Sequence, residues 1–245
     1  TSGFIAVEYS NVDALKEVIE ANADKICGFL VEPIQGEAGV NVPADGYLKA
    51  CYDLCKANNI LFIADEIQTG IARTGKMLAI DHENIKPDML ILGKALSGGA
   101  YPVSGVLTRN DVMDVIHPGQ HGSTYGRNPL ACAVAREALQ VVLDEKLADN
   151  AERLGQIFRM EINKLVEEFP LFKSVRGKGL LNAILINDTP DSDTAWNFCL
   201  KMMENGLLAK PTHGNIIRFA PPLVMTEEQL MECIEIIRKT AKEFQ

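Results

Sequence analysis

Two apolar runs, each leading to one ionisable residue, constrain this 245-residue chain most. Residues 60–64 (ILFIA) lead directly into Asp65, and residues 89–93 (MLILG) lead into Lys94. Short apolar runs bounded by breakers are typical of fully buried strands in a parallel sheet. Because ligands of such sheets bind beyond the carboxyl ends of the strands, we expect a carboxylate and an amine at one sheet edge.

That pair of groups suits a cofactor that carries a basic ring nitrogen and an aldehyde. Asp65 would keep the ring nitrogen protonated, and Lys94 would bond covalently to the aldehyde carbon. On the residues alone, two structural alternatives stay open. Asp65 would then be an N-cap at the end of a strand, and Lys94 a solvated lysine.

A nucleotide hydrolase is a rival interpretation of the same region. Residues 70–77 (GIARTGKM) nearly match a phosphate-binding loop, and Asp65-Glu66 after an apolar run is typical of a metal-binding strand. However, Met77 stands where a hydroxyl residue should hold Mg²⁺, and no strand leads directly into the loop. The sequence therefore disfavours nucleotide hydrolysis.

Charge and composition narrow the class of partner. The net charge of -9 argues against nucleic acid, whose phosphates need a basic surface. No apolar run reaches the roughly 18 residues that a membrane span needs. Among the six cysteines, Cys51 and Cys55 lie one helical turn apart with no histidine at zinc-ligand spacing, so we expect no metal site.

The order of elements predicts two domains. Up to residue 146, strands and helices alternate, which predicts an α/β domain with a mostly parallel sheet. Residues 147–245 begin with a long amphipathic helix and continue with strands near 180–186, 207–209 and 216–219, which predicts a smaller α+β domain. The first domain, residues 1–146, holds only about four strands and lacks a Gly-rich phosphate loop. We therefore expect it to be the carboxyl-terminal part of a larger sheet.

Two further polar features are candidates for ligand binding. Residues 121–126 (HGSTYG) precede a helix that starts at Pro129, and their hydroxyl and amide groups suit a phosphate. Arg218 lies in a mostly apolar strand and therefore needs a carboxylate partner or a ligand, for which Glu37 is a candidate. An ordinary polar loop and a plain structural ion pair are the alternatives.

Six stretches of the chain resemble the class III aminotransferases, which are pyridoxal 5'-phosphate enzymes of the type I fold. DEIQTG at 65–70 with GKALSGG at 93–99 is highly specific for this class. Within the class, the chain is most similar to the members that act on ornithine. The matching stretches are residues 31–40, 61–76, 91–104, 121–131, 175–184 and 207–224.

The resemblance implies a role for each cofactor residue. Lys94 would be the catalytic lysine bonded to the cofactor, and Asp65 would pair with its pyridine nitrogen. Gln68 would reach the ring hydroxyl, and Ile67 would pack against the ring. Two hydroxyl residues would bind the phosphate of the neighbouring subunit's cofactor, which implies a homodimer with shared sites. These two are Ser123 and Thr124.

The resemblance also implies the substrates. Arg218 would bind a carboxylate of 2-oxoglutarate or glutamate, and Glu37 would cover Arg218 when ornithine is bound. The expected reaction moves the δ-amino group of ornithine to 2-oxoglutarate, giving glutamate and glutamate semialdehyde, which cyclises to pyrroline-5-carboxylate. That reaction serves arginine metabolism and proline biosynthesis. The alternatives are a relative that acts on acetylornithine or 4-aminobutyrate, and an inactive fragment.

Two departures from the family pattern stand out. Family members carry a long amino-terminal portion with the phosphate cup, the ring-stacking aromatic residue and the residues that bind ornithine; a separate chain could supply it here. Arg127 stands where the family usually has glycine, which adopts backbone conformations that arginine avoids. We expect the protein in the cytoplasm, with the mitochondrial matrix as the alternative.

Overall fold

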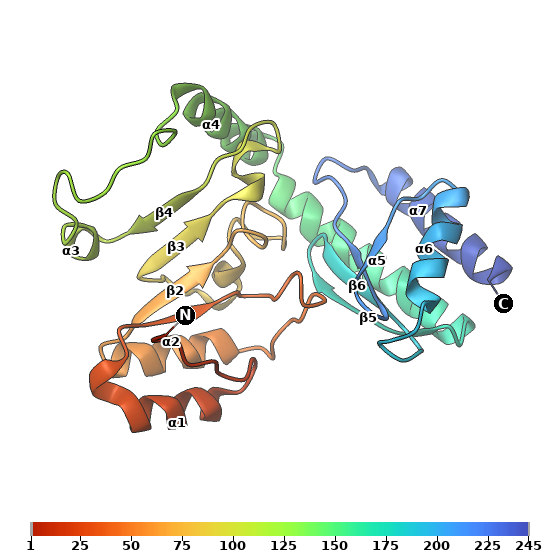
Figure 1. Ribbon diagram of the computed structural model, residues 1–245. Coiled ribbons are helices and arrows are strands. Elements are labelled where there is room, and N and C mark those ends of the chain that lie inside the picture. Colours follow the sequence, from red (N-terminus) through yellow and green to blue (C-terminus); the bar gives the residue numbers. More distant parts are fainter. Residues whose placement is uncertain (1, 245) are drawn as a thin grey trace. The chain divides into compact units, whose positions relative to one another are not determined.

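The computed structural model describes residues 2–244 and divides the chain into two compact units (Figure 1). The first unit comprises the residues up to 33 together with 43–70 and 78–141. The second comprises 34–42, 71–77 and the residues from 142 onward. The predicted division into residues 1–146 and 147–245, whose ends Thr1 and Gln245 lie outside the described residues, stays a prediction.

The first unit is built on one four-stranded sheet. Its strand order is β1-β2-β3-β4, with parallel pairing from β1 to β3 and an antiparallel fourth strand. Its regular elements are α1 (Val12–Asn22), β1 (Gly28–Val31), α2 (Tyr47–Ala57), β2 (Leu61–Asp65), β3 (Met89–Leu92), β4 (Gly105–Thr108), α3 (Asn110–Met113) and α4 (Pro129–Asp144), which ends in the second unit.

The core of the first unit lies between the sheet and two helices. Figure 1 shows α2 between α1 and the strands. Leu48, Cys51 and Cys55 recur at helical spacing on α2 and are buried against Phe62 of β2. This packing fixes one face of the sheet and leaves the carboxyl ends of β2 and β3 as the edge that carries the ionisable residues.

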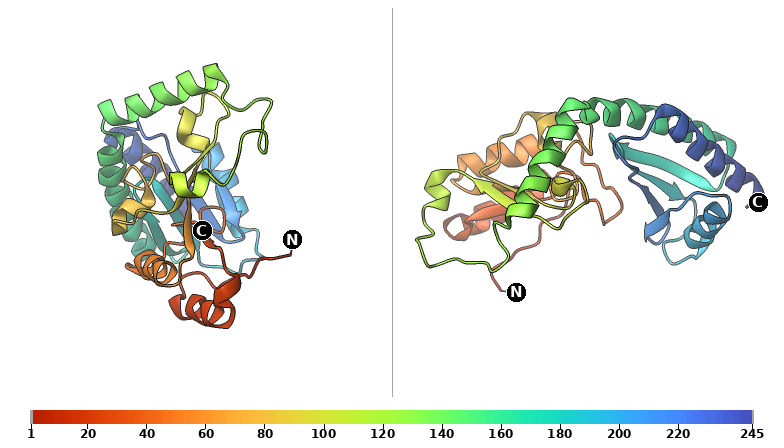
Figure 2. Two further views of the ribbon diagram at one scale, coloured as in Figure 1. Left: turned by 90° about the vertical axis from the view of Figure 1, so that its left-hand side faces the viewer. Right: turned by 90° about the horizontal axis from the view of Figure 1, so that it is seen from above.

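The second unit has a four-stranded antiparallel sheet in the order β5-β6-β8-β7. Figure 2 shows α5 and α7 side by side along this sheet. Its elements are α5 (Leu147–Glu168), β5 (Phe172–Lys178), β6 (Leu181–Ile186), α6 (Thr194–Glu204), β7 (Lys210–His213), β8 (Ile216–Phe219) and α7 (Glu227–Glu243).

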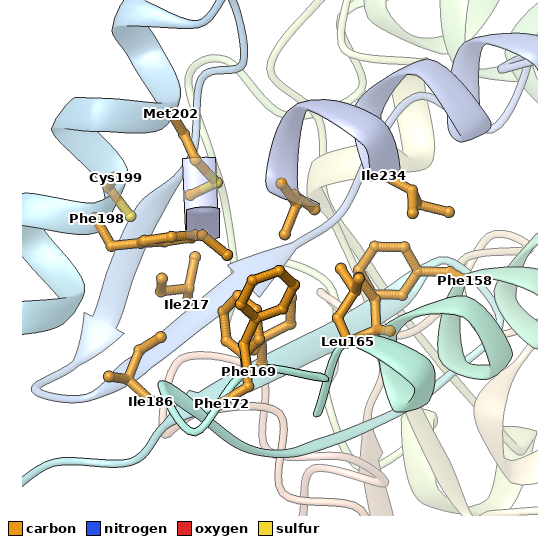
Figure 3. Packing of buried hydrophobic residues seen from close by; sticks show 14 of the residues in the cluster. Phe158, Leu165, Phe169, Phe172, Ile186, Phe198, Cys199, Met202, Ile217 and Ile234 are labelled. Carbon is orange, nitrogen blue, oxygen red and sulfur yellow. The ribbon is translucent and has the colours of Figure 1, made fainter. Parts of the chain in front are cut away.

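Alternation along β6 gives the second unit two packed faces. Ile184 and Ile186 belong to a core that contains Phe158, Phe172 and Phe198. Figure 3 shows Ile186 together with these three phenylalanines. In contrast, Leu181 and Ala183 are buried against Ile34 and Val40 of the inserted segment 34–42. One face of the sheet is therefore covered by helices and the other by this inserted segment.

The predicted elements are mostly confirmed, with one clear error. Residues 207–209 are not a strand; β7 begins at Lys210, where pairing with Arg218 of β8 starts. Leu207 and Ala209 instead pack against the helical core from an irregular segment. Their apolar character reflects burial without sheet pairing.

The residues that the structure describes contain neither a membrane-spanning helix nor a cluster of metal-ligating side chains. No helix within residues 2–244 combines the length and the apolar character needed to cross a bilayer. In the same part of the chain, no group of three or more His, Cys, Asp or Glu side chains is placed to hold a metal ion.

Candidate active site

Asp65 and Lys94 follow adjacent parallel strands at the same sheet edge. Asp65 is the last residue of β2 and pairs in register with Ile91 of β3, three residues before Lys94. The amide of Glu66 donates to the carbonyl oxygen of Ile91 at 3.0 Å, which extends the pairing by one residue. The sheet therefore brings the carboxylate and the amine to one edge, as the sequence predicts.

The Asp65 side chain fixes the loop that follows β2. Its Oδ1 accepts a hydrogen bond from the amide of Ile67 at 3.0 Å, which makes an Asx-type turn. Asp65, Ile67 and Gln68 are all half-buried. A Cβ on Gly70 would lie 2.8 Å from the carbonyl oxygen of Glu66, so only glycine fits where the loop closes.

Glu66 supports this loop, a role that differs from the metal binding considered in the nucleotide-hydrolase interpretation. It is 1% exposed, and its Oε1 accepts from the amide of Ile80 at 2.9 Å. Thr69 donates its hydroxyl to the other carboxylate oxygen. Burial raises the pKa of Glu66 above its ordinary value. The signal was present in the sequence, because Glu66 continues the buried alternation of Phe62 and Ala64.

Lys94 begins a short 3₁₀ turn, Lys94–Ser97, directly after the strand β3 and Gly93. Its φ of 42° lies in the left-handed region, where a non-glycine residue is uncommon. The residue is exposed in this chain. An outlying backbone held at a strand end is typical of a functional position.

Ser123 and Thr124 lie in an exposed segment between α3 and α4. The hydroxyl of Ser123 accepts from the amide of Gly126 at 3.0 Å. Asn128 caps α4, since its Oδ1 accepts from the amide of Leu130 at 2.9 Å. Among residues 2–244, no hydrogen bond joins Ser123 or Thr124 to Asp65 or Lys94.

Arg127 adopts a left-handed backbone, with φ at 57°. This is the conformation that glycine adopts at little cost, so the chain keeps a glycine-like geometry with an arginine. The departure noted in the sequence therefore changes the side chain next to the hydroxyl segment without removing the turn.

Arg218 and Glu37 form an ion pair in the second unit. Nη1 of Arg218, on β8, lies 2.6 Å from Oε1 of Glu37 in the inserted segment. The arginine side chain is 18% exposed and the glutamate side chain 65% exposed. Arg218 also borders a cavity of about 340 Å³ whose other walls are mostly apolar. The carboxylate covers a mostly buried cation and can itself reach solvent.

The segment that resembles a phosphate loop has a structural role. Arg73 donates from Nη1 to the carbonyl oxygens of Leu180 at 3.1 Å and Pro221 at 2.6 Å. Burial lowers the pKa of the Arg73 guanidinium to about 10. Residues 71–77 are thereby tied into the second unit, so this segment is part of its packed structure.

Comparison with known proteins shows the family to which the chain belongs. Residues 6–241 match the family model described as Aminotransferase class-III, and the chain belongs to that family. The predicted family and fold class are confirmed.

Particular relatives refine this assignment. The chain is 60% identical over 238 residues to ornithine aminotransferase, mitochondrial, of Drosophila melanogaster, which covers 97% of the chain and 54% of that relative. The chain therefore spans about half the length of the curated relatives it matches.

Two solved structures are similar in sequence and in fold. The acetylornithine aminotransferase of Elizabethkingia anophelis is 67% identical with a TM-score of 0.97, over 99% of this chain and 63% of that one. The ornithine aminotransferase of Toxoplasma gondii is 51% identical with a TM-score of 0.95, over 100% of this chain and 57% of that one. The Toxoplasma structure is described as having partial occupancy of PLP at its active site.

Proposed function

We propose that the protein containing this chain transfers the δ-amino group of ornithine to 2-oxoglutarate, with pyridoxal 5'-phosphate as its cofactor. The products are glutamate and glutamate semialdehyde, which cyclises to pyrroline-5-carboxylate, a step that serves arginine metabolism and proline biosynthesis. The observation that carries this proposal is the ion pair between Glu37 and Arg218. A site that accepts a dicarboxylate and ornithine in turn needs an arginine whose charge can be covered or uncovered.

The donor set fits pyridoxal 5'-phosphate. When bound, the cofactor supplies an electrophilic carbonyl carbon and a ring that draws electrons while its nitrogen is protonated. The Asp65 carboxylate holds that proton at the pyridine nitrogen. Gln68 donates to the ring hydroxyl, and Ile67 covers one ring face. The relatives' names and the Toxoplasma structure support this cofactor.

Lys94 has two roles in the proposed reaction. Its Nζ would hold the cofactor between turnovers, and the same nitrogen, once free, would remove a proton from the δ-carbon of ornithine as a general base. The hydroxyls of Ser123 and Thr124 bind the phosphate in the neighbouring subunit. The active form is therefore a homodimer with shared sites.

Glu37 and Arg218 let one site accept substrates of different charge. Arg218 binds a carboxylate of 2-oxoglutarate or glutamate after Glu37 has moved away. When ornithine is bound, Glu37 pairs with the guanidinium again, since a mostly buried arginine left without a partner is costly. The switch keeps Arg218 paired in both half-reactions.

A second candidate substrate is N-acetylornithine, which the 67% identical structure from Elizabethkingia favours by its name. The Drosophila relative favours ornithine, as does the Toxoplasma structure. Turnover of the cofactor-loaded protein with each amine separates the two. A preference for N-acetylornithine would contradict our substrate assignment.

The reaction class has its own test. Borohydride should reduce a yellow chromophore and add the cofactor's mass at Lys94. Lys86→Ala is the matched control, since Lys86 is an exposed lysine before β3, and it should keep both colour and label. A colourless protein with no added mass on Lys94 would support an inactive fragment.

Two further assignments complete the proposal. The site residues beyond this chain belong to the half of the relatives that it does not span, supplied by the same polypeptide or a separate chain. We place the protein in the cytoplasm, with the mitochondrial matrix as the alternative because the Drosophila relative is named mitochondrial.

A further inference from the structure

A row of directly paired residues crosses the sheet of the second unit. Arg176 of β5 pairs with Ala183 of β6, which pairs with Arg218 of β8, which in turn pairs with Lys210 of β7. Directly paired residues share one face of a sheet, so three cations lie in line on the face that the inserted segment covers. Ala183 between the two arginines is buried and lets the residue 35–41 turn lie close to the sheet.

Two side chains of this sheet hold the backbone of the 35–41 turn. Arg176 donates from Nε and Nη2 to the carbonyl oxygen of Gly39, at 3.1 and 2.8 Å, and from Nη2 to Oδ1 of Asn41 at 2.8 Å. Thr212 donates its hydroxyl to the carbonyl oxygen of Glu37 at 2.6 Å. The backbone is therefore anchored at the carbonyl of Glu37 itself and again at Gly39, two residues further on.

The turn adopts a conformation that its own residues disfavour. Val40 is β-branched and fully buried, yet its φ is 56°, in the left-handed region. Gly39 has a φ of 110°, and a Cβ on it would lie 2.6 Å from Cδ1 of Ile216. Such a backbone persists only where its surroundings hold it, and the anchoring side chains provide that hold.

Thr212 lies at an irregularity of its strand. Pro211 pairs with Ile217 and His213 pairs with Ile216, so the ladder between β7 and β8 shifts at Thr212. A bulge of this kind redirects a side chain relative to the regular alternation. Here the bulge lies at Thr212, whose hydroxyl donates to the backbone carbonyl of Glu37, the partner of Arg218.

We propose that Thr212 and Arg176 are positioning residues that set substrate preference by fixing the backbone of Glu37. The switch is then a rotation of the Glu37 side chain alone, over an anchored turn. This inference deepens the proposed function and rests on it. Loosening the anchor withdraws the carboxylate from Arg218, which disfavours ornithine and favours a dicarboxylate.

Thr212→Val tests the inference, because it removes the hydroxyl and keeps the shape. In the cofactor-loaded protein, we expect the ratio of kcat/KM for ornithine to kcat/KM for glutamate to fall about three- to tenfold, the worth of one hydrogen bond. Glutarate, a dicarboxylate with no amine, should bind tighter by a similar factor in calorimetry. Glu37→Gln should shift both quantities in the same direction and further.

Three comparisons make the result decisive. Thr212→Ser keeps the hydroxyl and should restore the wild-type ratio, and Thr189→Val, an exposed threonine of the same unit, should leave it unchanged. A lower Tm with an unchanged ratio and unchanged glutarate affinity would overturn the inference. The glutarate measurement needs no turnover, so it tests the anchor even in a protein that fails to act on ornithine, which would refute the proposed function instead.

Discussion

The two units hold their candidate functional groups in different ways. In the first unit, backbone geometry fixes Asp65 and Lys94 at the ends of paired strands, while the amine of Lys94 stays exposed. In the second unit, Arg218 is in direct contact with Glu37, and the turn that carries Glu37 is anchored by further side chains. In the first arrangement the reactive groups can bind a ligand directly. In the second, a ligand must displace Glu37 before it can bind Arg218. We therefore expect substitutions of Asp65 and Lys94 to lower turnover, and substitutions of Glu37, Arg218 and the side chains that anchor Glu37 to change substrate preference.

The largest effect should come from Lys94→Ala. Loss of the amine removes both the covalent attachment and the general base, so kcat should fall by at least about 10²–10⁴-fold. Glutarate affinity, which depends on Arg218 of the second unit, should stay within twofold. A parallel loss of glutarate binding would show that the two units do not act separately.

Asp65→Asn should have the next largest effect. The amide keeps the shape and can still accept from the amide of Ile67, but it no longer stabilises a protonated ring nitrogen. We expect kcat to fall about 10²–10³-fold, the usual cost of removing one electrostatic contact from a reacting group. Stopped-flow absorbance with ornithine measures it, and turnover within fivefold of wild type would contradict the role of Asp65.

Glu66→Ala should cost stability in the first unit. It leaves the buried amide of Ile80 and the hydroxyl of Thr69 without their carboxylate partner, at about 1–3 kcal/mol of unfolding free energy. Glu66→Gln, which keeps an acceptor, is the matched control and should lose less. The preference between ornithine and glutamate should not move in either variant.

The difference in Tm between Glu66→Gln and the wild type should depend on pH. Burial raises the pKa of Glu66 in the folded state, so ionisation costs more there than in the unfolded chain. Stability contributed by this group is present below its ordinary pKa and is lost as pH rises through the raised value. The Tm of Glu66→Gln should therefore rise relative to wild type over the pH range that starts at about 4.3, the ordinary pKa of a glutamate, and ends at the raised pKa. A constant difference across that window would contradict the burial argument.

The smallest effect should come from Thr226→Ala at the start of α7. The Thr226 hydroxyl accepts from the amide of Gln229, whose side chain accepts in return from the amide of Thr226. Loss of this capping box should cost about 1 kcal/mol. Thermal unfolding measures the loss, and the substrate preference should stay constant because neither Arg218 nor Glu37 is touched. A changed preference would mean that general loosening of the second unit, and not the anchor at Thr212, governs the switch.

The sequence predicted the strands that are continuous apolar runs, although most residues of β2 and β3 are half-buried and not fully buried as expected. The strands β2 and β3 are continuous apolar runs, and their ends identified Asp65 and Lys94. The strand β5 escaped prediction because only Phe172 of its residues is buried and the rest are half-buried or exposed. The strand is stabilised by its backbone pairing with β6 and not by burial of its own side chains.

Contacts between distant segments could not be predicted in the same way. Arg176 and Gly39 are 137 residues apart, and the bond between them depends on how the 35–41 turn packs on the sheet. Glu37 was a candidate partner of Arg218 because an arginine in an apolar strand needs a carboxylate. No comparable rule singles out a threonine hydroxyl that bonds to a backbone carbonyl.

The interleaved division of the chain has an evolutionary consequence. Segments 34–42 and 71–77 belong to the second unit although the chain enters and leaves them from the first. A gene fragment starting at residue 142 would encode a small sheet stripped of the cover that Ile34 and Val40 give to Leu181. A single recombination event at residue 142 would therefore not transfer the second unit complete. The two units are expected to be inherited together.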